Sequence, residues 1–158
     1  MSELDASPAV ETGMLIRRPA AEVFEAFIDP DITTKFWFTR SSGTLVAGQQ
    51  VQWEGEMYGV SIPVDVKVVE PHRRIVVEWP GEGGPGIVEW LFTPMDEDST
   101  FVGIANTGFT GGGAELAKQT ADAAEGFSLV LAGLKALLEH GVRLNLVADR
   151  FPKGLDEK

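Results

Sequence analysis

The sequence predicts an α+β protein in which one curved antiparallel sheet wraps around a single long C-terminal helix. Between residues 51 and 106, apolar side chains recur at every second position in short runs, the period of strands with one buried face. After Gly111 the apolar period becomes 3.6 and continues for about 26 residues, the pattern of an amphipathic helix. An apolar sheet face must be covered, and this helix is the one large cover that the sequence offers.

The chain before the sheet predicts one strand and one short helix. Residues 10–17 alternate weakly in polarity, as a strand would. Pro19 sets a helix-compatible dihedral at a position where a first helical turn needs no N–H. The segment 20–28 then places its bulky apolar residues on one helical face, and the pair 29–30, Asp-Pro, ends it. The next segment contains Phe-Trp-Phe at 36–38 and has no clear period.

The middle of the chain predicts an antiparallel meander. Proline- and glycine-rich turn signals separate its alternating runs at intervals of about ten residues. The expected strands cover residues 51–57, 64–68, 75–79, 88–92 and 102–106.

The C-terminal helix predicts its own ends. Glu115 suits a helix start, and His140 followed by Gly141 suits a helix end, through the dipole and a left-handed cap respectively. The apolar residues that follow predict no defined element. We therefore expect residues 1–158 to form a single domain, with a core from about 14 to 140 and a C-terminal tail at 141–158.

Composition excludes several classes of function. The net charge of −11 provides no basic surplus to replace the counterions of nucleic acid, so we expect no nucleic-acid partner. The absence of cysteine excludes disulfides, thiolate metal sites and a cysteine nucleophile. No apolar run approaches the length of a membrane span and no secretory signal is visible, so we expect no membrane insertion and a cytoplasmic location.

Several segments, taken together, resemble a known superfamily. Their order and spacing are similar to the START-like (SRPBCC) superfamily, and within it to the branch named for the activator of Hsp90 ATPase. The resemblance implies the helix-grip fold, with a pocket between the sheet and the long helix. It selects no chemistry, because such folds serve lipid carriers, cyclases, oxygenase domains and co-chaperones alike. The segments that carry the resemblance are residues 16–30, 64–79, 106–109, 125–128 and 134–139.

The strand pattern predicts that Trp53, Trp79 and Trp90 face the helix, because each lies at an apolar position of its alternating strand. They are either the walls of a ligand pocket, which are typically apolar and aromatic, or ordinary core residues. With the pocket implied by the resemblance, we predict a set of ligand-binding residues. They are Trp37, Trp53, Met57, Trp79, Trp90, Ile104, Asn106, Thr120 and Phe127.

Three of these residues have specific alternative interpretations. Asn106 faces inward, so its amide either anchors a ligand or bonds to nearby backbone. Thr120 lies on the apolar stripe of the helix, where threonine often bonds to its own preceding turn. Trp37 belongs either to a lid over the pocket or to an apolar cluster packed beneath its own loop.

No catalytic or metal site is predicted. Glu54 and Glu56 share a strand face, but it is the polar face, and paired carboxylates could act as acid and base only if one of them were desolvated. His72 and His140 have no evident serine and carboxylate partners for a catalytic triad, and they do not belong to a motif with the spacing of metal ligands. We expect no cofactor.

The leading functional hypothesis is a binding protein for an apolar small molecule, lipid-like or polyketide- and aromatic-like. A cyclase- or hydrolase-like enzyme using the same pocket is the first alternative. The second is a stress or co-chaperone type of interaction protein, which could form a homodimer. Its contact patch could be formed by Leu129, which lies off the helix stripe, and by the tail residues Val142, Leu144, Leu146 and Phe151. The alternative is that these residues dock the tail on its own chain.

Overall fold

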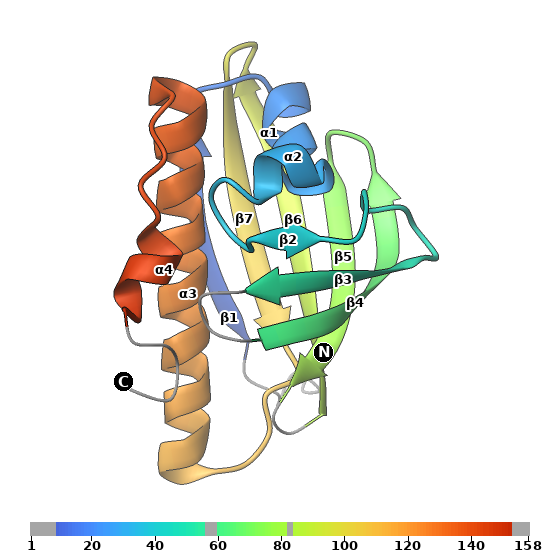
Figure 1. The fold of residues 1–158 in the computed structure, drawn as a ribbon, viewed down its shortest axis with the longest axis vertical. Helices are drawn as coiled ribbons and strands as arrows, with labels where there is room; N and C mark the ends of the chain where they lie inside the picture. Colours follow the sequence, from blue (N-terminus) through green and yellow to red (C-terminus); the bar gives the residue numbers. More distant parts are fainter. Residues whose placement is uncertain (1–8, 56–59, 82–83, 153–158) are drawn as a thin grey trace.

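The computed structural model describes residues 9–55, 60–81 and 84–152. It confirms the α+β architecture: an antiparallel sheet in the order β1-β7-β6-β5-β4-β3-β2 curves around one long helix (Figure 1). The strands are β1 (Val10–Ile16), β2 (Arg40–Ser41), β3 (Gln50–Gly55), β4 (Val60–Glu70), β5 (Arg74–Gly81), β6 (Gly84–Asp96) and β7 (Ser99–Thr107). The helices are α1 (Ala20–Ile28), α2 (Pro30–Thr33), α3 (Gly113–His140) and α4 (Leu146–Arg150).

The inner face of the sheet follows the predicted alternation. Ile75, Trp90 and Ile104 lie opposite one another on β5, β6 and β7, and none is more than 2% exposed. The alternation fails in β4, where a register shift between Val66 and Val68 inserts one extra residue. Such a bulge moves the following side chains to the other face. Val69 therefore packs against the core in the place that the sequence pattern predicts for Val68.

The sheet is covered by two helical elements at different places. Figure 1 shows α1 and α2 over one end of the sheet, while α3 runs along its side. Val23, Phe24 and Phe27 of α1 are buried, as their spacing predicts. In α3 the fully buried residues begin only at Phe127, so the first half of this helix contributes less to the core than its continuous apolar stripe predicts.

The C-terminal end of α3 has the predicted cap. Gly141 adopts a left-handed conformation with φ of 66°, and its N–H donates to the carbonyls of Ala136 and Leu137. This geometry satisfies terminal carbonyls and suits glycine, which has no Cβ to clash. The chain then turns back, and α4 lies beside α3 (Figure 1).

One buried carboxylate ties α3 to the start of the chain. Glu139 Oε2 accepts hydrogen bonds from the Arg17 N–H at 2.7 Å and from Lys135 Nζ at 2.8 Å. The same ammonium donates to the carbonyl of Leu15 at 2.8 Å, which satisfies an acceptor on the free edge of β1. Burial alone would raise the pKa of Glu139, but the hydrogen bonds from Lys135 and Arg17 outweigh it and hold the pKa below its ordinary value.

Glu139→Gln is expected to lower the free energy of unfolding near neutral pH, and this difference from the unaltered protein is expected to disappear in acid. A carboxyl whose pKa is lowered on folding contributes stability above its unfolded pKa, near 4.5, and loses it as the pH falls through the lower folded value. Urea unfolding of both proteins from pH 7 down to pH 3 should therefore show the difference shrinking below about pH 4.5. Glu97→Gln, in the exposed turn between β6 and β7, is the control. A difference that stays constant with pH would contradict the assignment.

Candidate functional site

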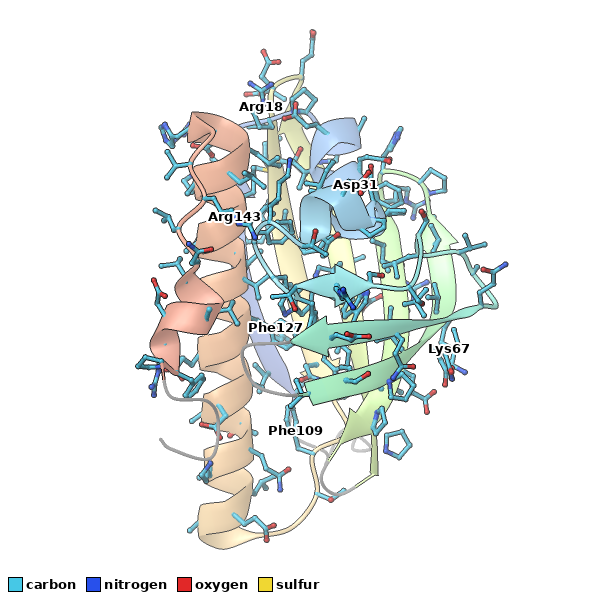
Figure 2. The ribbon with its side chains drawn as sticks, viewed as in Figure 1. Arg18, Asp31, Lys67, Phe109, Phe127 and Arg143 are labelled. Atoms are coloured by element: carbon cyan, nitrogen blue, oxygen red, sulfur yellow. The ribbon has the colours of Figure 1, made fainter. Side chains whose placement is uncertain are left out.

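A cavity of about 310 Å³ opens between α3 and the sheet. Its volume lies at the low end of the range for small-molecule sites. Five parts of the chain contribute to its wall: the segment after α2, the sheet, the loop after β7, α3 and α4. Figure 2 shows two of these residues, Phe127 on α3 and Phe109 on the loop that leads to it. The lining residues are Trp37, Phe38, Trp79, Asn106, Phe109, Ala123, Gly126, Phe127, Val130 and Val147.

Three aromatic rings of this wall have a regular mutual orientation. The rings of Trp79 and Phe127 are parallel within 10°, with centroids 6.3 Å apart. Trp37 stands nearly perpendicular to both, with its centroid 6.3 Å from Trp79 and 6.2 Å from Phe127. Flat apolar surfaces in these orientations are suited to contact with another aromatic ring, by stacking or by edge-to-face packing.

The position of Trp37 is fixed by hydrogen bonds around it. The backbone N–H of Trp37 donates to the Thr33 carbonyl at 2.9 Å, and the Thr33 hydroxyl in turn donates to the carbonyl of Ala26 at 2.6 Å. Two residues later, both the N–H and the hydroxyl of Thr39 donate to the Glu54 carbonyl on β3. Trp37 is consequently only 9% exposed, so it is at once a cavity wall and a core residue.

Asn106 provides the polar group of the cavity. Its Nδ2 donates to the backbone carbonyls of Ile87 at 3.0 Å and Thr107 at 3.2 Å. These bonds match the backbone alternative and orient the amide. Among the described residues no hydrogen bond reaches the Oδ1 acceptor, although the side chain also lines the cavity.

A smaller cavity of about 150 Å³ adjoins the first and shares Trp79, Asn106 and Phe109 with it. Its remaining wall includes Gln119 and Asp122 of α3. The Asp122 carboxylate is paired with Lys118 at 2.8 Å, and this smaller space is more polar than the first. The two adjoining cavities therefore combine a mostly apolar wall with a more polar one.

Apart from Thr120, the predicted ligand-binding residues divide into three groups in the structure. Trp37, Trp79, Asn106 and Phe127 line the larger cavity. Trp53, Trp90 and Ile104 are buried behind that wall, at no more than 2% exposure, and line neither of these two cavities. Met57 lies outside the described residues.

Thr120 forms the local bonds expected of a threonine within a helix. Its hydroxyl donates to the carbonyls of Leu116 and Ala117, both at 3.1 Å, and it lines neither of these cavities. Behind the wall, the indole N–H of Trp90 is buried and finds no acceptor among the described residues. An unpaired buried donor costs free energy, which makes this part of the core less favourable than its dense aromatic packing suggests.

Several residues of the wall were not among the ligand-binding residues predicted from the sequence. Ala123 and Phe127 share the apolar stripe of α3, so helical spacing points to Ala123. Gly126 lies one step off the stripe and Val147 lies in the tail, where no period exists. Their roles follow only from where the chain turns back after Gly141.

Of the polar residues that were considered for catalysis, Glu54, His72 and His140 have ordinary surroundings, and Glu56 lies outside the described residues. Glu54 faces Arg40 at 4.0 Å on the partly exposed outer side of β3. His72 occupies the turn before β5 and packs edge-on against Phe24. Within the described ranges, no group of three or more histidine, cysteine or carboxylate residues could hold a metal ion. No helix of the described residues has both the length and the apolarity to cross a membrane.

The fold is that of START-type helix-grip proteins, as solved structures show. Protein SSP2350 from Staphylococcus saprophyticus is 26% identical with a TM-score of 0.73, over 87% of this chain and 96% of its own. A START superfamily protein from Mycobacterium smegmatis matches with a TM-score of 0.62 and 14% identity, over 82% of this chain and 98% of its own.

The sequence places the chain more narrowly. It belongs to the family described as activator of Hsp90 ATPase homolog 1-like protein, which matches residues 17–139. Among its structural relatives is the Aha1 dimer from Colwellia psychrerythraea, with a TM-score of 0.71 and 17% identity, over 85% of this chain and 98% of that one. DynU16, from the dynemicin biosynthetic locus, has a TM-score of 0.71 and 23% identity, over 85% of this chain and 48% of its own. No curated protein matches the sequence.

Proposed function

We propose that this protein binds a small, neutral, flat apolar or aromatic molecule in the cavity between α3 and the sheet. The observation that carries the proposal is the arrangement of Trp37, Trp79 and Phe127 around an open space of about 310 Å³, with the Asn106 amide beside them. Ligand sites commonly combine an apolar wall with a few fixed polar groups. Binding would come from burial of apolar surface, with one hydrogen bond from a ligand donor to Asn106 Oδ1.

The charges around the cavity favour a neutral ligand over an anionic one. None of the described residues that line it is basic, and the chain carries a net charge of −11. A carboxylate brought into this space would lose hydration without gaining a cationic partner, which is costly. A hydroxyl would lose much less. Alcohols and phenols therefore fit the site better than fatty acids do.

The proposal is tested with two matched probes, 2-naphthol and 2-naphthoate, titrated against the tryptophan fluorescence of the purified protein. We expect 2-naphthol to bind with one-to-one stoichiometry and 2-naphthoate to bind at least about tenfold more weakly. Native mass spectrometry of the purified protein should in addition show a releasable small molecule. Absence of a co-purified molecule together with no binding of either probe would overturn the proposal.

The enzyme alternative has less support. Among the described residues that line the two adjoining cavities, Asp122 alone has an ionisable side chain. Its carboxylate is half-exposed and paired with Lys118. General acid–base catalysis by a carboxyl needs a desolvated position, whereas this carboxylate is half-exposed.

A homodimer is a secondary proposal. The Aha1 relative from Colwellia psychrerythraea was solved as a dimer, and this chain has Leu91 and Phe101 exposed beside a depression on the outer face of β6 and β7. An exposed apolar patch of this kind is typical of contact surfaces. Light scattering on the purified chain would measure its mass directly, and a monomer at high concentration would contradict the proposal.

A further inference from the structure

The cavity has one wall that lies outside the part of the chain matched by the family. That match ends at residue 139, whereas Val147 is on α4. Val147 is half-buried and packs against the aromatic core. The walls contributed by the sheet and α3 therefore belong to the matched region, while the wall contributed by α4 lies beyond it.

Val147 also separates two spaces. On one side lies the cavity of about 310 Å³, and on the other lies a space of about 50 Å³ between the tail and the segment after α2. Val147 and Trp37 line both spaces. The side chain of Val147 is therefore part of a partition whose removal would lengthen the cavity toward Thr34 and Arg143.

The side-chain bonds that the described residues show between this tail segment and the rest of the chain are exposed. Arg150 pairs with Glu125 of α3 at 2.8 Å, and these side chains are 45% and 40% exposed. Arg143 Nη2 donates to the carbonyl of Thr34 at 3.4 Å, which connects the tail to the segment of Trp37. Figure 2 shows Arg143 at the upper part of α3, above the level of Phe127. Exposed ion pairs contribute little stability, and α4 itself contains no fully buried residue.

Two residues that precede α4 have left-handed backbone geometry. Gly141 and Asn145 both have positive φ, 66° and 57° respectively. The chain therefore changes direction at two defined residues before it enters the five-residue α4. A short helix held by turns and exposed side-chain bonds opens more easily than the sheet or α3.

We propose that Val147 is a specificity-determining residue, which sets the largest ligand that the cavity admits. The inference rests on the proposed function, since it names the residue that limits ligand size in the same site. A ligand that extends past Phe127 toward α4 meets the Val147 side chain. Shortening this side chain opens the space beyond it, and enlarging it closes the cavity further.

The test compares Val147→Ala with Val142→Ala, a matched change at a tail residue that is 44% exposed and does not line the cavity. Each protein is titrated with 2-naphthol and with the larger 1-hydroxypyrene. Methyl-sized changes in an apolar pocket alter discrimination by about tenfold or more. Val147→Ala should therefore improve the affinity ratio for 1-hydroxypyrene over 2-naphthol by roughly tenfold. Val142→Ala should leave the ratio unchanged.

A second measurement does not depend on any ligand. Acrylamide quenching of the tryptophan fluorescence should increase in Val147→Ala relative to Val142→Ala, because Trp37 and Trp79 line the opened space. Failure of both probes to bind the unaltered protein would count against the proposed function, and the quenching result would still test the wall. Equal quenching in the two variants, or equal shifts of the affinity ratio, would overturn the role of Val147.

Discussion

Phe27→Ala is expected to lower the free energy of unfolding by about 3–5 kcal/mol, the usual cost of removing a buried phenylalanine ring. Phe27 is 2% exposed and lies where α1 meets the sheet. Its ring centroid is within 6 Å of the rings of Phe36, Trp90 and Phe92, and 6.4 Å from that of Trp37. These large rings are held by their own strands and turns, so they cannot collapse into the space that Phe27 leaves.

The control for this substitution is Phe101→Ala on the outer face of the sheet. Phe101 is 42% exposed, so the same loss of a ring should cost about 1 kcal/mol or less. Guanidinium unfolding monitored by tryptophan fluorescence measures both values, with the slope against denaturant checked for constancy. Equal losses in the two variants would show that Phe27 is not a centre of the core.

The exposure of Phe101, beside the buried Val102 on β7, reflects what strand periodicity conveys. Side chains on alternating positions divide cleanly between the two faces of the sheet, so Trp90 and Ile104 could be placed inside from the sequence alone. The register shift in β4 could not be placed, because valines occupy positions 64, 66, 68 and 69 and either parity looks apolar. Strand β2 was also missed, since two residues carry no period.

The candidate site depends on a second property that strand periodicity does not convey. Trp79 and Trp90 share one parity and both face inward, yet only Trp79 lines the larger cavity. The difference arises along the strands and not across the sheet. Trp90 is covered by Phe27 and Trp37. Trp79, by contrast, pairs with Gly86 near the end of β5 and stacks on Phe127, the residue at which the buried part of α3 begins. Periodicity gives the face of a residue but not its depth beneath the covering helices.

The same cause explains why the tail could not be interpreted. Val147 becomes part of the site only because Gly141 ends α3 with a turn and α4 returns beside it. The sequence offers a cap signal at Gly141 but no pattern that sets the direction of the following chain. Of the two alternatives for the apolar tail, the structure supports docking for Val147, which packs on the core, while Val142 and Leu144 stay exposed.

Gly126→Leu is expected to weaken binding of 2-naphthol by at least about tenfold while the protein stays as stable as before or becomes slightly more stable. Gly126 lines the cavity within α3, and a Cβ built on it meets no heavy atom within 4 Å. Leucine favours a helix over glycine by about 0.5–1 kcal/mol, so the backbone gains from the change. The new side chain would occupy the space that the ligand is proposed to fill.

The matched control is Ala121→Leu, which adds a leucine to an exposed position of the same helix. It should leave the affinity for 2-naphthol unchanged, and chemical unfolding of all three proteins should confirm that each is folded. Unaltered affinity in Gly126→Leu would show that the probe binds elsewhere, and the proposed cavity function would then fail. Loss of affinity with retained stability has a different meaning: a glycine that weakens its own helix would be of use to the protein because it leaves room for a ligand.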